Sequence, residues 1–265
     1  MKMSTKHFKR FRAPAMVLVA IGLIAGTFLV TYPVSASTLT DPVHRLRFPY
    51  IFLSATISWE PAKTMGSFIL SMGSVPFTFA ILARKLELDL RRTQLPRKEA
   101  PVGEVPSVCD LCRWAETVAF ILHAISVTGA LGVCAAQSHV YMGLHILFAS
   151  MFFLGGSFAA LCQTWVDYGL GNTCSLAVRR FRLVTALVPA VLSPVFISMR
   201  GQTAIPVIFF AAVAEITAMA FLCAYYLSWA ASFSTFTVVV GAVDHRSGLE
   251  RGVSGDTSEW DDEEG

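Results

Sequence analysis

Long runs of apolar residues, rather than alternating apolar and polar positions, dominate the chain. A helix needs about 20 consecutive apolar residues to cross the hydrocarbon core of a bilayer, whereas a transmembrane β-strand shows about ten alternating ones. Backbone groups in lipid must satisfy their own hydrogen bonds, so runs of this length form helices. The pattern predicts an all-α, polytopic six-helix transmembrane bundle, with spans at residues 14–32, 66–83, 114–136, 142–165, 183–199 and 206–233.

The composition agrees with a membrane protein. Of the 265 residues, 54% are hydrophobic and only 15% are charged, whereas a soluble domain carries about 25% charged residues. This argues against a soluble globular protein. Aromatic side chains that prefer the headgroup layer stand near the ends of the runs and support the predicted boundaries; they are Tyr32, Trp114, Tyr141, Trp165 and Trp229.

The basic residues predict the orientation, because loops rich in Lys and Arg stay in the cytosol. All but four of the 21 Lys and Arg residues lie at the N-terminus, in the connection 84–113, in the fourth-to-fifth connection or in the tail. We therefore expect a cytosolic N-terminus (1–13), a membrane domain (14–240) and a disordered, acidic cytosolic tail (241–265). The four basic residues on the predicted lumenal side are Arg45, Arg47, Lys63 and Arg200.

The first run also permits a second interpretation. Basic residues precede it, and the small residues Val34, Ser35 and Ala36 follow it, which is the pattern of a cleavable secretory signal. Its apolar core is longer than the about 7–15 residues usual in a signal. We expect an uncleaved first helix, whereas cleavage would leave five spans and a lumenal N-terminus.

The connection between the first two runs, residues 33–65, is unusually apolar. Its stretch 48–53 is too short to span the membrane and is bounded by Arg47 and by Glu60 with Pro61. Segments of this size lie in the interface or re-enter the bilayer. We expect this lumenal loop to pack across the lumenal end of the bundle.

Glu215 is the most pointed candidate for a functional residue. It lies in the sixth run, about 13 Å along the helix and hence near mid-bilayer, where an acid must be protonated, paired or facing water. It is either a functional acid or a structural one that is hydrogen-bonded to a neighbouring helix. His123, midway along the third run, is a candidate partner for it; a structural His packed among small residues is the alternative.

Polar side chains also gather on the predicted lumenal side of the bundle. Cations and hydroxyl groups hydrogen-bond phosphate, so Ser54, Lys63 and Arg200 are candidates for binding a lipid headgroup. An ordinary polar rim that also includes Gln202 is the alternative interpretation.

Acyl or phosphoryl chemistry on a headgroup needs groups that transfer protons. The catalytic candidates are Glu215, His139, His145 and Glu60. The sequence contains no motif for a hydrolase nucleophile, a phosphate loop or a dinucleotide site. The Cys-x-x-Cys at residues 109–112 lacks the second pair that a zinc site needs, so we expect no metal and no cofactor.

Three stretches resemble, in their order and spacing, a known six-span family over residues 14–240. They are Phe48-Pro49-Tyr50 followed by residues 53–58 and Glu60-Pro61-Ala62-Lys63; His139 through Gly143 to Gln163; and Glu215 with Tyr226 and Ser228. The family includes post-GPI-attachment-to-proteins factor 2, the FGF-receptor-activating protein and the damage-regulated autophagy modulators. The chain departs from the pattern where Gly66 replaces the aromatic residue of one branch, and where Lys63 replaces the commoner Arg.

The resemblance implies one of two functions. One branch implies GPI-anchor lipid remodelling in the ER and Golgi, either as the acyl-transfer component or as its essential partner. The other implies a non-enzymatic lysosomal or plasma-membrane regulator of autophagy or phosphoinositide balance. Residues 54–58 and 61–63 favour the first. The expected partners are membrane lipids and GPI-anchored proteins, with no nucleic acid; the absence of an internal repeat argues against a transporter.

Overall fold

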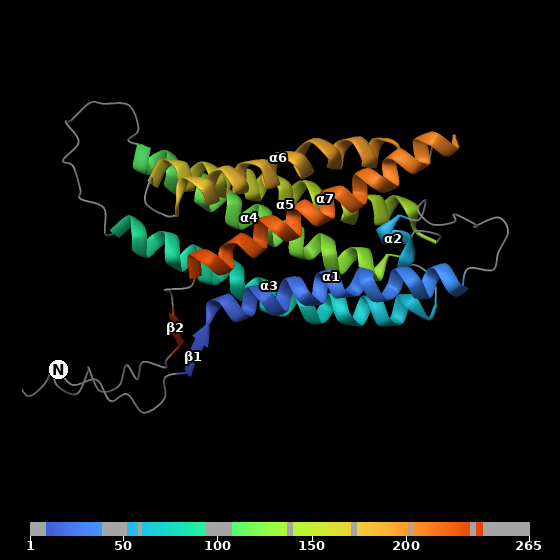
Figure 1. Cartoon of the computed structure of the whole chain (residues 1–265), viewed down its shortest axis with the longest axis horizontal. Helices are drawn as coiled ribbons and strands as arrows, with labels where there is room; N and C mark the ends of the chain where they lie inside the picture. The colour runs from blue at the N-terminus through green and yellow to red at the C-terminus, as the bar shows by residue number, and fades with distance from the viewer. Residues whose placement is uncertain are drawn as a thin grey trace, which may run out of the picture. The chain divides into compact units, whose positions relative to one another are not determined.

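The helices form a bundle, and six of those in the described part of the chain are long and apolar enough to cross a membrane (Figure 1). The computed structural model describes residues 9–38, 52–57, 60–93, 108–136, 140–170, 174–200, 202, 204–233 and 237–240, so the predicted site residue His139 and the tail 241–265 lie outside the described residues. The six long helices are α1 (Ala13–Thr38), α3 (Ala62–Thr93), α4 (Val108–Ala135), α5 (Met142–Leu170), α6 (Leu176–Ser198) and α7 (Ile205–Ser232). They confirm the predicted all-α six-helix bundle.

Several helices extend beyond the apolar runs that predicted them. At the standard rise of 1.5 Å per residue, α3 is about 48 Å long, against about 30 Å for the hydrocarbon core. The prediction that residues 84–93 belong to a loop is therefore wrong, and so is the prediction that Arg182 lies in a loop, because α6 begins at Leu176. Within α3, Arg91 and Glu87 form an ion pair of 2.6 Å at i,i+4 spacing, which supports the helix beyond its apolar part.

A short strand pair at the chain ends was not predicted. Strands β1 (Lys9–Arg12) and β2 (Thr237–Val240) form a two-stranded sheet. The chain divides into two compact units, one of which contains the two chain ends and the other residues 12–236 with all the helices. Four-residue strands joining distant segments give no periodicity long enough to detect in a sequence.

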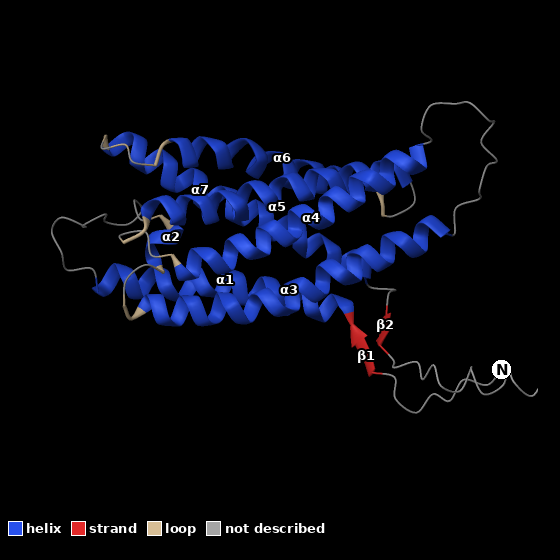
Figure 2. Cartoon of the chain, turned by 180° about the vertical axis from the view of Figure 1, so that it is seen from behind, coloured by secondary structure: helices blue, strands red, loops and turns tan. Residues whose placement is uncertain are grey.

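Helices α4 and α5 lie side by side in the bundle (Figure 2), and glycines allow them to approach closely. A Cβ atom added at Gly129 of α4 would lie 2.4 Å from the backbone nitrogen of Phe152 in α5, and one added at Gly155 would lie 3.1 Å from the Leu122 carbonyl oxygen of α4. Small residues at such contacts are typical of helix packing in membranes. Gly22 on α1, by contrast, has nothing within 4 Å of an added Cβ.

We predict that Gly129→Ala destabilises the bundle by about 1–3 kcal/mol, because the obstructing atoms belong to the α5 backbone and cannot rotate away. Gly22→Ala is the matched control, and we expect it to leave stability unchanged or to raise it by up to about 1 kcal/mol. Thermal unfolding of both variants in detergent measures the difference. Equal unfolding temperatures for the two variants would contradict the close packing of α4 on α5.

Candidate functional site

A four-residue helix, α2 (Leu53–Thr56), lies at the end of the bundle where α1 ends and α3 begins (Figure 1). Two α1 side chains hold its last residue: the Thr31 and Thr56 hydroxyl oxygens are 2.9 Å apart, and the Ser35 hydroxyl donates to the Thr56 carbonyl oxygen over 2.8 Å. These contacts agree with the expectation that the loop after the first helix packs across one end of the bundle. We call this end the α2 end; its lumenal location remains a prediction.

Gly66 gives α2 the space it needs. A Cβ atom added there would lie 2.4 Å from Ile57 Cγ2 and 2.9 Å from Thr31 Cγ2. This explains the departure from the family pattern at this position, because an aromatic side chain would overlap the segment that follows α2.

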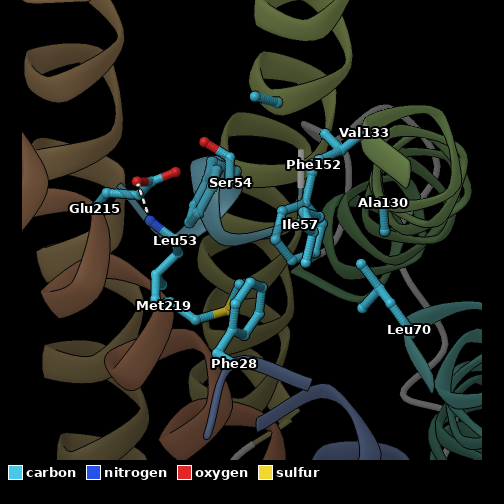
Figure 3. Close-up of a pocket in the computed structure, with 12 residues that line it drawn as sticks. Phe28, Leu53, Ser54, Ile57, Leu70, Ala130, Val133, Phe152, Glu215 and Met219 are labelled. Atoms are coloured by element: carbon cyan, nitrogen blue, oxygen red, sulfur yellow. Dashed lines mark hydrogen bonds between the residues drawn. The ribbon is translucent and has the colours of Figure 1, made fainter. Parts of the chain in front are cut away.

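Glu215, which belongs to α7, also contacts α2. Its Oε2 atom accepts a hydrogen bond of 2.9 Å from the Leu53 backbone N–H, the first in α2 (Figure 3). Its Oε1 atom lies 3.9 Å from Arg200 Nη2, and its side chain is 1% exposed. The carboxylate therefore acts as a cap supplied by another helix, since the first backbone N–H groups of a helix have no partner within it.

His123 is not the partner of Glu215. Its Nδ1 atom is 3.4 Å from the Tyr226 hydroxyl oxygen, and its ring meets the Trp229 ring edge to face at 5.6 Å. The alternative interpretation of His123, a buried structural residue, fits this geometry.

The assignment of Trp229 to the headgroup layer is wrong, because its side chain is fully buried. Its position near the end of an apolar run did not show which face of the helix it occupies, and the ring packs inside the bundle.

Arg200 follows α6 and joins α2 to α7. Its Nη2 atom donates to the Ser54 hydroxyl, and its guanidinium lies over the Phe52 ring, 4.9 Å from the ring centre. The side chain is 8% exposed. Its Nη1 atom is buried and has no hydrogen-bond partner among the described residues.

His145 lies in the first turn of α5 and is fully buried at the same end. Its Nδ1 atom is 2.7 Å from the Ala136 carbonyl oxygen. We call Ser54, His145, Arg200 and Glu215 the α2-end cluster.

Lys63 and Glu60 pair with each other just before and at the start of α3. Lys63 Nζ is 3.6 Å from Glu60 Oε1, and Glu60 accepts hydrogen bonds from the Thr64 hydroxyl at 2.7 Å and the Thr64 N–H at 3.2 Å. The Thr64 hydroxyl is the main reason why the pKa of Glu60 lies below its usual value. Gln202 is exposed.

A small apolar cavity lies directly beneath α2 (Figure 3). Its volume is about 20 Å³, and Ser54 and Glu215 are the two polar residues among those that line it. A space of this size holds about one water molecule, so it does not accommodate an acyl chain in this conformation. Among the residues that the structure describes, no three His, Cys, Asp or Glu side chains could hold a metal ion.

A second buried cluster, at the opposite end of α3 and α5, was not predicted from the sequence. Arg84 donates to Glu87 over 2.7 Å and also to Asp167, while Arg182 donates to Asp167 over 2.6 Å. Arg182 further binds the hydroxyl groups of Ser228 and Ser232 on α7. We call this set the ionic network.

The ionic network was missed because its basic residues border the apolar runs and were assigned to loops. The sequence did contain one signal, Asp167, an acid that lies just beyond the fourth apolar run. If the helix continues past that run, a buried cation must neutralise this carboxylate. Arg84, Asp167 and Arg182 are all fully buried, and they link α3, α5 and α6 through charges that no solvent screens.

We predict that Arg182→Gln destabilises the protein by about 3–5 kcal/mol, because it leaves the buried Asp167 carboxylate with one cation fewer. Arg180→Gln removes the same charge from an exposed position two residues earlier and is expected to change stability little. Thermal unfolding in detergent compares the two. A similar loss in both variants would mean that the network does not stabilise the bundle.

For Glu215 we predict that Glu215→Gln is milder than Glu215→Ala. The amide oxygen of Gln still accepts from the Leu53 N–H, whereas Ala leaves that buried donor without a partner, at a cost of about 1–3 kcal/mol. Unfolding temperatures of the two variants provide the measurement. Equal destabilisation would show that the charge of Glu215, rather than its capping of α2, is what matters.

Comparison with known proteins identifies the family. The Frag1/DRAM/Sfk1/Cwh43P N-terminal domain model matches residues 13–236, which include all six long helices and α2. Neither the curated proteins nor the solved structures give a match. The family match and the six membrane-crossing helices together show that this chain is a multi-pass membrane protein of the Frag1/DRAM/Sfk1/Cwh43P N-terminal domain family.

Proposed function

We propose that this chain is a component of GPI-anchor lipid remodelling in the ER and Golgi, and that it binds lipid headgroups at its α2 end. The observation that carries the proposal is the Arg200 guanidinium, which is almost fully buried beside Ser54 and has an Nη1 atom without a partner among the described residues. A cation with unused N–H donors at the end of a membrane bundle is suited to phosphate.

The contacts around Arg200 distinguish the residues that bind the lipid from those that position the binding residues. Glu215 uses one carboxylate oxygen to cap α2 and faces Arg200 with the other. We therefore assign Glu215 to positioning α2 and Arg200, and we leave it out of the group that contacts the lipid. Because α2 carries Ser54, a shift of this helix would also displace the hydroxyl that orients the guanidinium.

Lys63, at the start of α3, is a more exposed cation than Arg200. It is 30% exposed and only 3.6 Å from Glu60, whose side chain is 58% exposed. Such an exposed pair contributes little to stability, so Lys63 can exchange Glu60 for a phosphate at low cost. The exposed fraction falls from 30% for the Lys63 side chain to 8% for the Arg200 side chain and 5% for Ser54, which is in keeping with a headgroup that approaches from the membrane surface.

Family membership supports the biological setting of the proposal. The matched family is described in part by the Cwh43P N-terminal domain, and the first loop resembles the GPI-remodelling branch in residues 54–58 and 61–63. The regulatory function of the autophagy-modulator branch is the competing outcome of the test below.

We predict that deletion of the gene alters the acyl chains of GPI-anchored proteins. When the Arg200→Ala variant is expressed in the deletion strain, we expect it to restore the normal acyl chains at least about tenfold less well than the wild type, because charge-assisted hydrogen bonds are lost. Mass spectrometry of the released anchors is the measurement, and Arg180→Ala is the matched control. Ser54→Ala, which removes a single hydroxyl group, extends the test in case Arg200→Ala does not accumulate in membranes. Unchanged acyl chains together with altered autophagic flux would contradict the proposal and favour the regulatory function.

A further inference from the structure

Two threonines on the same face of α1 use their hydroxyl groups differently. A threonine inside a helix can donate to the carbonyl oxygen four residues earlier, and Thr27 does so, with its Oγ1 atom 2.9 Å from the Leu23 oxygen. Thr31 lies one turn further along α1, and both side chains are fully buried. The Thr31 hydroxyl oxygen instead lies 2.9 Å from that of Thr56 in α2. Thr31 therefore connects α1 to another element, whereas the Thr27 hydroxyl bonds within its own helix.

The direction of the hydrogen bond between the two hydroxyl groups follows from a neighbouring contact. Thr56 Oγ1 donates to the Leu53 carbonyl oxygen over 2.6 Å, and a hydroxyl group has only one proton to donate. Thr31 is therefore the donor to Thr56. Because the Leu53 N–H in turn donates to Glu215 of α7, a series of hydrogen bonds runs from α1 through α2 to α7.

Ser35 holds the other end of α2. Its hydroxyl donates to the Thr56 carbonyl oxygen over 2.8 Å, and its side chain is 1% exposed. The last carbonyl groups of a helix have no partner within it, so Ser35 satisfies one end of α2 as Glu215 satisfies the other. A helix of four residues is not stable by itself. Its orientation therefore depends on these contacts from α1 and α7.

We infer that Thr31 and Ser35 are positioning residues of the proposed headgroup site. By holding α2 from α1, they keep the Ser54 hydroxyl where it accepts the hydrogen bond from Arg200. Both side chains are buried, so they act through α2 and not on the lipid. The inference deepens the proposed function and rests on it for the statement that this site serves GPI-anchor remodelling.

The hydroxyl group of Thr31 can be tested separately from its methyl group. The methyl carbon, Cγ2, packs close to α3, because a Cβ atom added at Gly66 would lie 2.9 Å from it. Thr31→Val keeps a methyl group there and removes the hydroxyl, whereas Thr31→Ser keeps the hydroxyl and removes the methyl. A positioning role through the hydroxyl predicts that only the valine variant is impaired, and a packing role predicts the reverse.

The first experiment expresses each variant of the full chain in the deletion strain and measures the acyl chains of GPI-anchored proteins, relative to the amount of the variant in membranes. We expect Thr31→Val and Ser35→Ala to restore the normal chains about fivefold less well than the wild type, the usual effect of one hydrogen bond. Thr31→Ser should restore them as the wild type does. Thr27→Val is the matched control, because it removes a buried hydroxyl that does not contact α2, and it should also restore them fully.

The second experiment measures hydrogen–deuterium exchange of the full chain in phosphatidylcholine nanodiscs. Backbone amides exchange when their segment opens locally, so a less firmly held α2 exchanges faster. We expect exchange in residues 53–56 to be about fivefold faster in Thr31→Val and in Ser35→Ala, and unchanged in Thr27→Val. This measurement does not depend on GPI anchors.

Full restoration of the acyl chains by Thr31→Val, or an impaired Thr31→Ser beside a normal Thr31→Val, would overturn the inference. Unchanged exchange in residues 53–56 of a folded Thr31→Val variant would overturn it as well. Normal acyl chains in the deletion strain would instead contradict the proposed function, and the exchange rates would still decide whether Thr31 and Ser35 position α2.

Discussion

Charge inside a membrane bundle must be neutralised by other groups of the protein, and in this chain that constraint ties the helices together at both ends. At one end Arg84 and Arg182 share the Asp167 carboxylate, which links α3, α5 and α6, and Arg182 continues to the hydroxyl groups of α7. At the other end Glu215 and Arg200 hold α2 between α7 and the end of α6. Separating these helices would expose buried charge to lipid, which costs at least about 2.5 kcal/mol for each group.

The two charged clusters differ in how completely their groups are used. In the ionic network both oxygens of Asp167 and both terminal nitrogens of Arg182 have partners, and Arg84 Nε is its one buried side-chain nitrogen without a partner among the described residues. In the α2-end cluster one nitrogen of Arg200 and one of His145 have none among the described residues. Unused hydrogen-bonding capacity at a buried position is costly, and a ligand that occupies it recovers that cost, which is why the α2 end is the better candidate for a binding site.

The sequence was sufficient for the features that depend on long apolar runs and on local motifs. The six helices, the packing of a segment of the first loop at one end of the bundle, and the family could all be predicted, because a span of about 20 residues is a strong signal. Contacts between distant residues could not. Glu215 was recognised as costly, yet its partner was sought at His123 on another span, because nothing in one sequence shows that residue 53 reaches residue 215. Arg84 and Arg182 were assigned to loops since a basic residue at the end of an apolar run looks the same whether it faces solvent or a buried carboxylate.

The account as a whole depends on a fixed α2 that presents Arg200 to the headgroup layer. The most direct measurement is an electron cryo-microscopy structure of the full chain in nanodiscs that contain phosphatidylinositol. The account predicts that Glu215 contacts the Leu53 N–H and that a headgroup phosphate lies within hydrogen-bonding distance of Arg200 Nη1. A structure in which α2 has left the bundle, or in which Arg200 faces only protein groups while lipid binds elsewhere, would contradict it.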